Sequence, residues 1–106
     1  MYKLVIISML LATLAFAATT DILPPKEASN ELAFIATDNY ECNYFIELAG
    51  QDLLLLASSH SKRDYDAFME HSTKATTICV YINKLITNDI VNIQNDVTYF
   101  YNQNYK

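Results

Sequence analysis

The chain has 106 residues, of which seven are basic and twelve are acidic, and it contains one glycine and two prolines. This length allows one small domain. The acidic balance argues against proteins that hold nucleic acid or an anionic membrane with clustered Lys and Arg. The scarcity of turn-forming residues argues against tight β-hairpins and permits long helices.

Residues 1–17 have the pattern of a cleavable secretory signal peptide. Lys3 precedes an apolar run over residues 4–16, and residues 15–17 (Ala-Phe-Ala) give the small-x-small pattern of a cleavage site. Because a membrane span needs about 20 apolar residues, an uncleaved anchor is the weaker alternative. We therefore expect a secreted, extracellular chain that begins at Ala18. Without Lys3 it keeps six basic and twelve acidic residues, a net charge of −6, and we expect no stable membrane insertion after cleavage.

The remaining chain is predicted to be a single helical domain over residues 25–106, after an extended lead-in over residues 18–24. Pro25 suits the first position of a helix, where its missing N–H is not needed. Apolar residues then recur at alternating steps of three and four, with one gap at Asn39, which predicts a helix over residues 25–57. These positions are Ala28, Leu32, Ile35, Cys42, Ile46, Ala49, Leu53 and Leu56.

Small polar residues predict a turn over residues 58–62, and Ser61 with Asp64 fits the capping box of a second helix over residues 62–86. Beyond Ile86 the apolar pattern shifts in phase, which indicates a bend or a break. Either the second helix continues into residues 88–103, or a separate helix begins near Asn88 and folds back. Because no Gly or Pro forces a break, continuation is preferred.

Cys42 and Cys79 are predicted to form one intramolecular disulfide, as expected for two cysteines in an exported domain. Their midpoint, residue 60.5, falls inside the predicted turn, and residues equidistant from the turn of an antiparallel hairpin face one another. The prediction is an all-α fold, either an antiparallel helical hairpin or a small helical bundle, stapled by this disulfide. Free buried thiols and an intermolecular bridge are the alternatives.

The sequence contains no motif that predicts catalysis. A single glycine excludes the G-x-S-x-G elbow, and paired cysteines are not nucleophiles. The cluster Asp64, Asp66, Glu70 and His71 lacks metal-site spacing, and acidic residues near a helix start are explained by the helix dipole. We therefore expect no enzymatic activity, no catalytic residue, no cofactor, no metal ion and no nucleic-acid partner.

Apolar residues outside the inward-facing stripes of the two predicted helices are the strongest functional signal. A two-helix hairpin leaves them exposed, so a folded-back segment, a second copy, a protein partner or a small apolar ligand must cover them. The leading hypothesis is binding to a protein partner or self-association, and an extracellular carrier of a small apolar ligand is the alternative. An antimicrobial or effector role is less consistent with the acidic charge. The predicted partner or ligand face consists of Phe34, Phe45, Leu48, Leu55, Ile78, Tyr81 and Leu85; the terminal aromatics Tyr99, Phe100, Tyr101 and Tyr105 are a second candidate surface.

Overall fold

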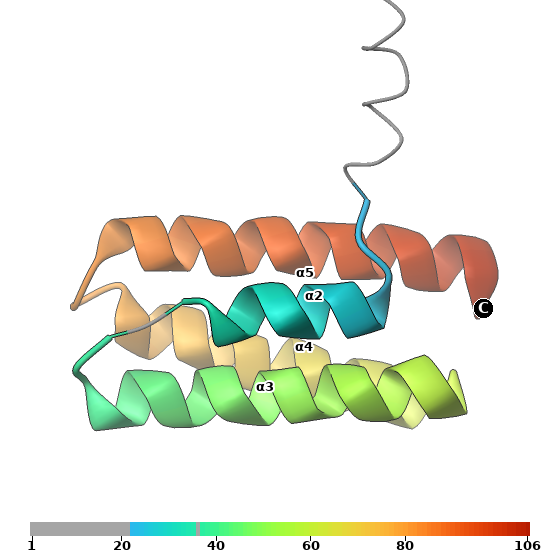
Figure 1. The fold of residues 1–106 in the computed structure, drawn as a ribbon, viewed down its shortest axis with the longest axis horizontal. Coiled ribbons are helices and arrows are strands. Elements are labelled where there is room, and N and C mark those ends of the chain that lie inside the picture. Colours follow the sequence, from blue (N-terminus) through green and yellow to red (C-terminus); the bar gives the residue numbers. More distant parts are fainter. Residues whose placement is uncertain (1–21, 36) are drawn as a thin grey trace, which may run out of the picture.

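The computed structural model describes residues 22–35 and 37–106, and the regular structure in these residues is entirely α-helical (Figure 1). This confirms the predicted all-α fold with one disulfide. The predicted signal peptide and most of the predicted lead-in lie outside the described residues. The helices are α2 (Pro25–Ala33), α3 (Tyr40–Ser59), α4 (Lys62–Cys79) and α5 (Lys84–Asn104).

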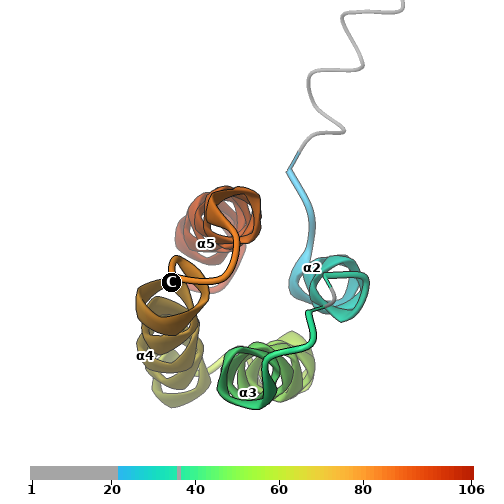
Figure 2. The same cartoon turned by 90° about the vertical axis from the view of Figure 1, so that its left-hand side faces the viewer.

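The four helices run antiparallel to their neighbours and form a small bundle (Figure 1). Each helix packs on the next one along the chain, and α2 also contacts α5, so the packing closes into a ring that Figure 2 shows nearly end-on. The contact between α2 and α5 is the sparsest in this ring. Because α2 has nine residues and α5 has twenty-one, α2 lies beside only part of α5.

The predicted continuous helix over residues 25–57 is wrong, because the chain breaks between Ala33 and Tyr40. At this break the Asn39 side chain is the N-cap of α3 and accepts a hydrogen bond of 2.8 Å from the backbone N–H of Cys42. The Thr37 hydroxyl in turn accepts from the backbone N–H of Asn39. These short polar side chains satisfy backbone groups outside a helix, which allows a break without Gly or Pro.

The predicted turn between the two hairpin helices is present but shorter than residues 58–62, since α3 ends at Ser59 and α4 begins at Lys62. Ser61 is the N-cap of α4, as its capping box predicted, and its hydroxyl accepts a hydrogen bond of 3.2 Å from the backbone N–H of Asp64. His60 adopts a left-handed conformation that ends α3.

The predicted helix over residues 62–86, and its preferred continuation into residues 88–103, are also wrong. Helix α4 ends at Cys79, and a separate helix α5 begins at Lys84. This start lies four residues before Asn88, near which the alternative placed it. Asn83 caps α5 by accepting a hydrogen bond of 2.9 Å from the backbone N–H of Leu85. As a result Ile82, which lies inside the predicted helix over residues 62–86, is exposed in the connection between α4 and α5.

The core lies along the inner faces of all four helices. Helix α5 folds back and buries one stripe of side chains at steps of three and four, so part of the apolar surplus is covered by the chain itself. Each fully buried large apolar side chain contributes about 1.5–3 kcal/mol. The largest such residues in this core are Phe68, Leu32, Leu53, Leu56, Ile90 and Val97.

Candidate interaction surface

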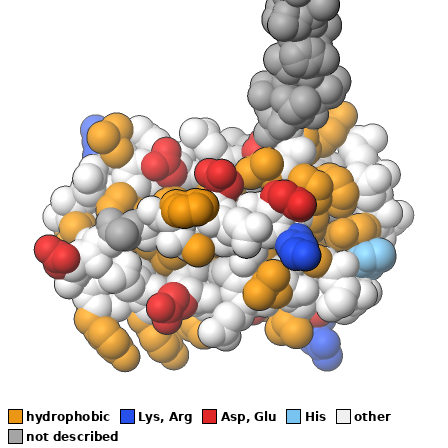
Figure 3. Space-filling model, in the orientation of Figure 1, with side chains coloured by type: hydrophobic (Ala, Val, Ile, Leu, Met, Phe, Trp, Pro, Cys, Tyr) orange, Lys and Arg blue, Asp and Glu red, His pale blue; other side chains and the backbone are white. Residues whose placement is uncertain are grey.

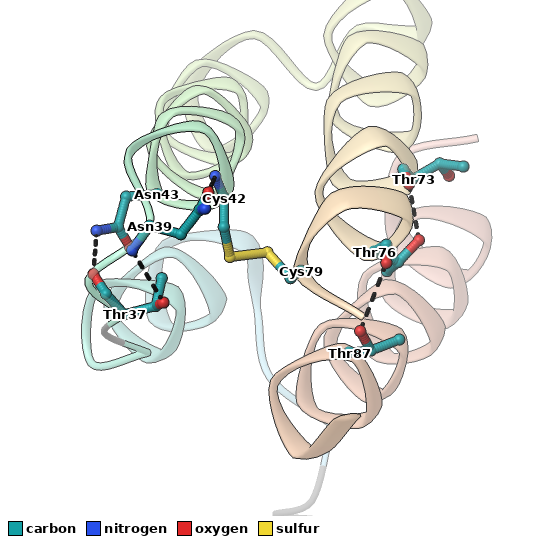
Figure 4. Close-up of a disulfide and its surroundings, with 8 residues drawn as sticks. All are labelled: Thr37, Asn39, Cys42, Asn43, Thr73, Thr76, Cys79 and Thr87. Atoms are coloured by element: carbon teal, nitrogen blue, oxygen red, sulfur yellow. Dashed lines mark hydrogen bonds between the residues drawn. A yellow bond between two sulfur atoms is a disulfide. The ribbon is translucent and has the colours of Figure 1, made fainter. Parts of the chain in front are cut away.

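The disulfide Cys42–Cys79 joins the first turn of α3 to the last turn of α4, with the Cα atoms 5.0 Å apart (Figure 4). This confirms the predicted pairing, and both cysteines are fully buried. The Thr87 hydroxyl of α5 donates to the carbonyl of Thr76, one turn before Cys79. The disulfide therefore lies at the end of the bundle where the α2–α3 and α4–α5 connections are, and it holds α3 and α4 together there.

The seven residues of the predicted partner face do not form one surface. Phe34 and Leu85 belong to a groove between α2 and α5, where their side chains are 82% and 68% exposed. This groove, which we call the α2–α5 groove, has a volume of about 540 Å³. Its apolar lining consists of Leu23, Phe34, Ile35, Leu85, Ile86 and Ile93, and its acidic lining consists of Glu31, Asp89 and Asp96; no Lys or Arg lines it.

The other five predicted residues lie elsewhere. Phe45 and Ile78 are half-buried in a shallow hollow between α3 and α4, where the Lys74 ammonium lies 5.8 Å from the centre of the Phe45 ring. Leu48 is half-buried on α3, and Leu55, also on α3, is 54% exposed. Tyr81 lies in the connection between α4 and α5 and is 86% exposed. Both pairs have charged neighbours: the hollow of Phe45 and Ile78 has one acidic and one basic lining residue, Glu41 and Lys74, whereas the charged lining beside Phe34 and Leu85 is acidic alone.

A second hollow lies between α2 and α3 and has a volume of about 410 Å³. Leu32, Ile46 and Leu54 are among its apolar lining residues. Beside it the Ser29 hydroxyl donates a hydrogen bond of 2.9 Å to the carbonyl of Gly50. This hollow, like the α2–α5 groove, is open to solvent. Neither hollow encloses a ligand as the interior of a carrier does.

Polar side chains between the helices bond to one another. His71 Nδ1 lies 2.6 Å from the Asp52 carboxylate and links α4 to α3. The Gln94 amide donates to the Ser72 hydroxyl at 2.7 Å and links α5 to α4. These pairs satisfy groups that would otherwise lose hydrogen bonds on burial. Both hydrogen bonds join neighbouring helices, so these four polar side chains have a structural role in the packing of the bundle.

The acidic residues at the start of α4 also have structural partners. The Ser59 hydroxyl donates to the Asp64 carboxylate and holds the pKa of this carboxyl below its ordinary value, against the opposing effect of burial. Asp66 pairs with Lys62 at 2.8 Å. Within residues 22–35 and 37–106, no group of three or more His, Cys, Asp or Glu side chains could hold a metal ion.

The C-terminal aromatic residues pack largely against the bundle. The Tyr101 ring stacks on Tyr65 with the ring centres 4.3 Å apart, and the Tyr105 ring stacks on His60 at 4.0 Å. Burial raises the pKa of the Tyr105 hydroxyl. Phe100 contacts the Tyr105 ring edge to face, and Tyr99 stays exposed. These residues close the end of the bundle away from the disulfide and do not form a continuous exposed surface.

Comparison of this chain with protein-family models, with curated proteins and with solved structures finds no match. Among the helices that the structure describes, none is long and apolar enough to cross a membrane.

Sequence reasoning missed the acidic lining of the α2–α5 groove because it placed neither helix break correctly. The available signal was the spacing of Asp89 and Asp96, which are seven residues apart, as are Ile86 and Ile93. Residues at this spacing share a helix face. These residues line one groove only when α5 is placed beside α2.

Proposed function

We propose that this chain is a secreted, non-enzymatic protein that binds a protein partner at the α2–α5 groove. The exposure of Phe34, which directly follows α2, and of Leu85, at the start of α5, on one groove carries the proposal. Large apolar side chains gathered on a surface mark sites of protein association. Part of the exposed apolar surface therefore lies at this groove, even after α5 has folded back.

Secretion is supported by the pattern of residues 1–17 and by the disulfide. A disulfide between buried cysteines is typical of proteins that fold in an oxidising compartment. It is also what a small domain needs when its core is limited. An extracellular location would make the partner another secreted protein or the outer part of a receptor.

The alternative function, an extracellular carrier of a small apolar ligand, has less support. A carrier surrounds most of the ligand surface with apolar side chains. The α2–α5 groove instead combines apolar residues with three carboxylates and is open to solvent. This lining fits a protein surface that combines apolar side chains with basic ones better than it fits a small apolar molecule.

Native mass spectrometry of the chain secreted by its own cells tests this function. We expect a polypeptide that begins at Ala18, is two daltons lighter before reduction, and carries a second, different polypeptide. The double substitution Phe34→Ser and Leu85→Ser should remove that polypeptide. The matched control, Tyr40→Ser and Leu55→Ser, replaces two exposed apolar residues outside the groove and should retain it.

Three outcomes would contradict the proposal. A stoichiometric small-molecule adduct would assign the chain to carriers, and a homodimer without another polypeptide would assign the surface to self-association. A mature chain that keeps residues 1–17 would contradict secretion by cleavage.

A further inference from the structure

We infer that the α2–α5 groove binds a cationic amphipathic helix of the protein partner. This inference rests on the proposed function and adds the chemistry of the partner segment. Partner helices commonly lay an apolar face into a groove and are held by side chains at steps of three, four and seven residues.

The shape of the groove suits a helix. Helices α2 and α5 lie antiparallel, and their contact is the sparsest in the ring (Figures 1 and 2). The groove of about 540 Å³ runs between them. Ile86 and Ile93, each less than a tenth exposed, contribute the inner lining. Phe34, the residue that follows α2, and Leu85, in the first turn of α5, are mostly exposed. An apolar stripe on the partner could contact all four residues.

The charge of the groove selects a cationic partner. Asp89 and Asp96 lie seven residues apart on α5, which is two helical turns or about 10.5 Å along the axis. Glu31 of α2 adds a carboxylate from the other side of the groove. Figure 3 shows acidic side chains interspersed with apolar ones on the face where α5 runs beside α2, with a basic side chain close to them that does not line the groove. The matching partner helix carries Lys or Arg seven residues apart, beside its apolar stripe.

The same charges disfavour a second copy of this chain as the occupant. Two identical grooves packed face to face would bring Glu31, Asp89 and Asp96 of one copy near the same residues of the other. Like charges placed across an interface oppose association. A basic helix has the complementary charge and an apolar stripe at the same time.

The inference is tested with a synthetic helix as the probe. The peptide has about five helical turns, Leu at steps of three and four, and Lys on both flanks of the Leu stripe. Its affinity for the folded, disulfide-bonded chain is measured by titration calorimetry. We expect saturable one-to-one binding that weakens as salt is added, because salt screens exposed charges.

Substitutions in the groove separate its charge from its apolar lining. Asp89→Asn with Asp96→Asn should weaken the affinity about threefold to tenfold and reduce its salt dependence. Phe34→Ser with Leu85→Ser should weaken it at least about tenfold, as the loss of apolar anchors does. The control pair Asp66→Asn with Glu70→Gln removes the same net charge from α4 and should leave the affinity as in the original chain. Thermal unfolding of every variant verifies that the bundle is intact.

Several results would overturn the inference. These are no binding, equal binding of a scrambled peptide of the same composition, or equal loss in the groove and control pairs. A dimer of the unmodified chain that dissociates on replacing Phe34 and Leu85 would assign the groove to a second copy. The proposed function is judged separately. If native mass spectrometry shows a partner that depends on Phe34 and Leu85 while the synthetic helix does not bind, the function stands and the cationic helix is wrong.

Discussion

At the scale of single residues, the Cys42–Cys79 bond is the main covalent constraint on the described fold. It closes a loop over a sequence separation of 37 residues. In the chain-entropy treatment a loop of this length stabilises the folded state by about 4 kcal/mol. Small domains have total stabilities of about 5–15 kcal/mol, so this is a large share.

We therefore expect Cys42→Ala with Cys79→Ala to lower the free energy of unfolding by about 4 kcal/mol, or less if the unfolded chain retains structure. Urea unfolding followed by circular dichroism measures the change. Reductant should lower the stability of the original chain to a similar level and leave the double variant unaffected. Equal stability with and without the bridge would contradict this expectation.

Asp64 provides a second prediction at the same scale. Hydrogen bonds from Ser59 and then Ser61 lower its pKa from the ordinary 3.8. A carboxyl with a lowered pKa in the folded state contributes stability above its unfolded pKa, and that contribution is lost as pH falls through the folded pKa. We expect Asp64→Asn to reduce the slope of unfolding free energy against pH below about pH 4.

Ser59→Ala is the matched test of the cause, because it removes the main hydrogen bond and leaves the carboxyl in place. The pKa of Asp64, followed by NMR of its carboxyl carbon, should rise towards the ordinary value in this variant. An unchanged titration of Asp64 would show that Ser59 does not set its pKa.

At the scale of elements, the two asparagine caps decide where helices begin. Asn39 starts α3 and Asn83 starts α5, each by accepting a backbone N–H through its side-chain oxygen. We expect Asn39→Ala to lower the free energy of unfolding by about 1 kcal/mol. Asn39→Asp should keep most of the stability, because a carboxylate oxygen accepts the same hydrogen bond.

Urea unfolding of the three chains checks this assignment. If the alanine and aspartate variants unfold at the same urea concentration, the side-chain oxygen of residue 39 is not what stabilises the start of α3.

These caps also explain what the sequence could and could not predict. The pairing of α3 with α4 and the disulfide followed from the helical spacing of apolar residues on both sides of the turn and from cysteines placed symmetrically about the His60–Ser61 bond. The breaks near Asn39 and Asn83 did not follow, because asparagine is only moderately unfavourable inside a helix. Its capping hydrogen bond forms only after the chain has turned. The direction of α5 depends on burial against α4, which is a tertiary effect.

The candidate site could likewise be predicted only in part from the sequence. Phe34 and Leu85 were predicted because exposed apolar side chains can be recognised from their position outside the inward-facing stripes. Their grouping with Asp89 could not be predicted, since it requires both breaks and the return of α5 beside α2. Of the seven predicted residues, Phe34, Leu55, Tyr81 and Leu85 are exposed, and the seven do not share one face. Their role in binding stays a prediction.

At the scale of the whole molecule, the ring of helices is unevenly stabilised. Helices α3 and α4 share the disulfide, the Asp52–His71 pair and the most extensive packing. Helix α2 has nine residues and buries only Pro25, Ala28, Ser29 and Leu32. Helices this short are not stable in isolation, so α2 depends on its contacts with the rest of the bundle.

We therefore expect α2 to open before the remainder of the domain unfolds. In native-state hydrogen exchange, amides of α2 should exchange at lower opening free energy than those of α3 near the disulfide, which should require global unfolding. Equal protection in α2 and α3 would contradict this order. Because α2 forms one side of the α2–α5 groove, a bound cationic helix should raise the protection of α2 more than that of α3. Local opening and binding are thereby linked: whatever occupies the groove stabilises the helix that is otherwise the first to leave the bundle.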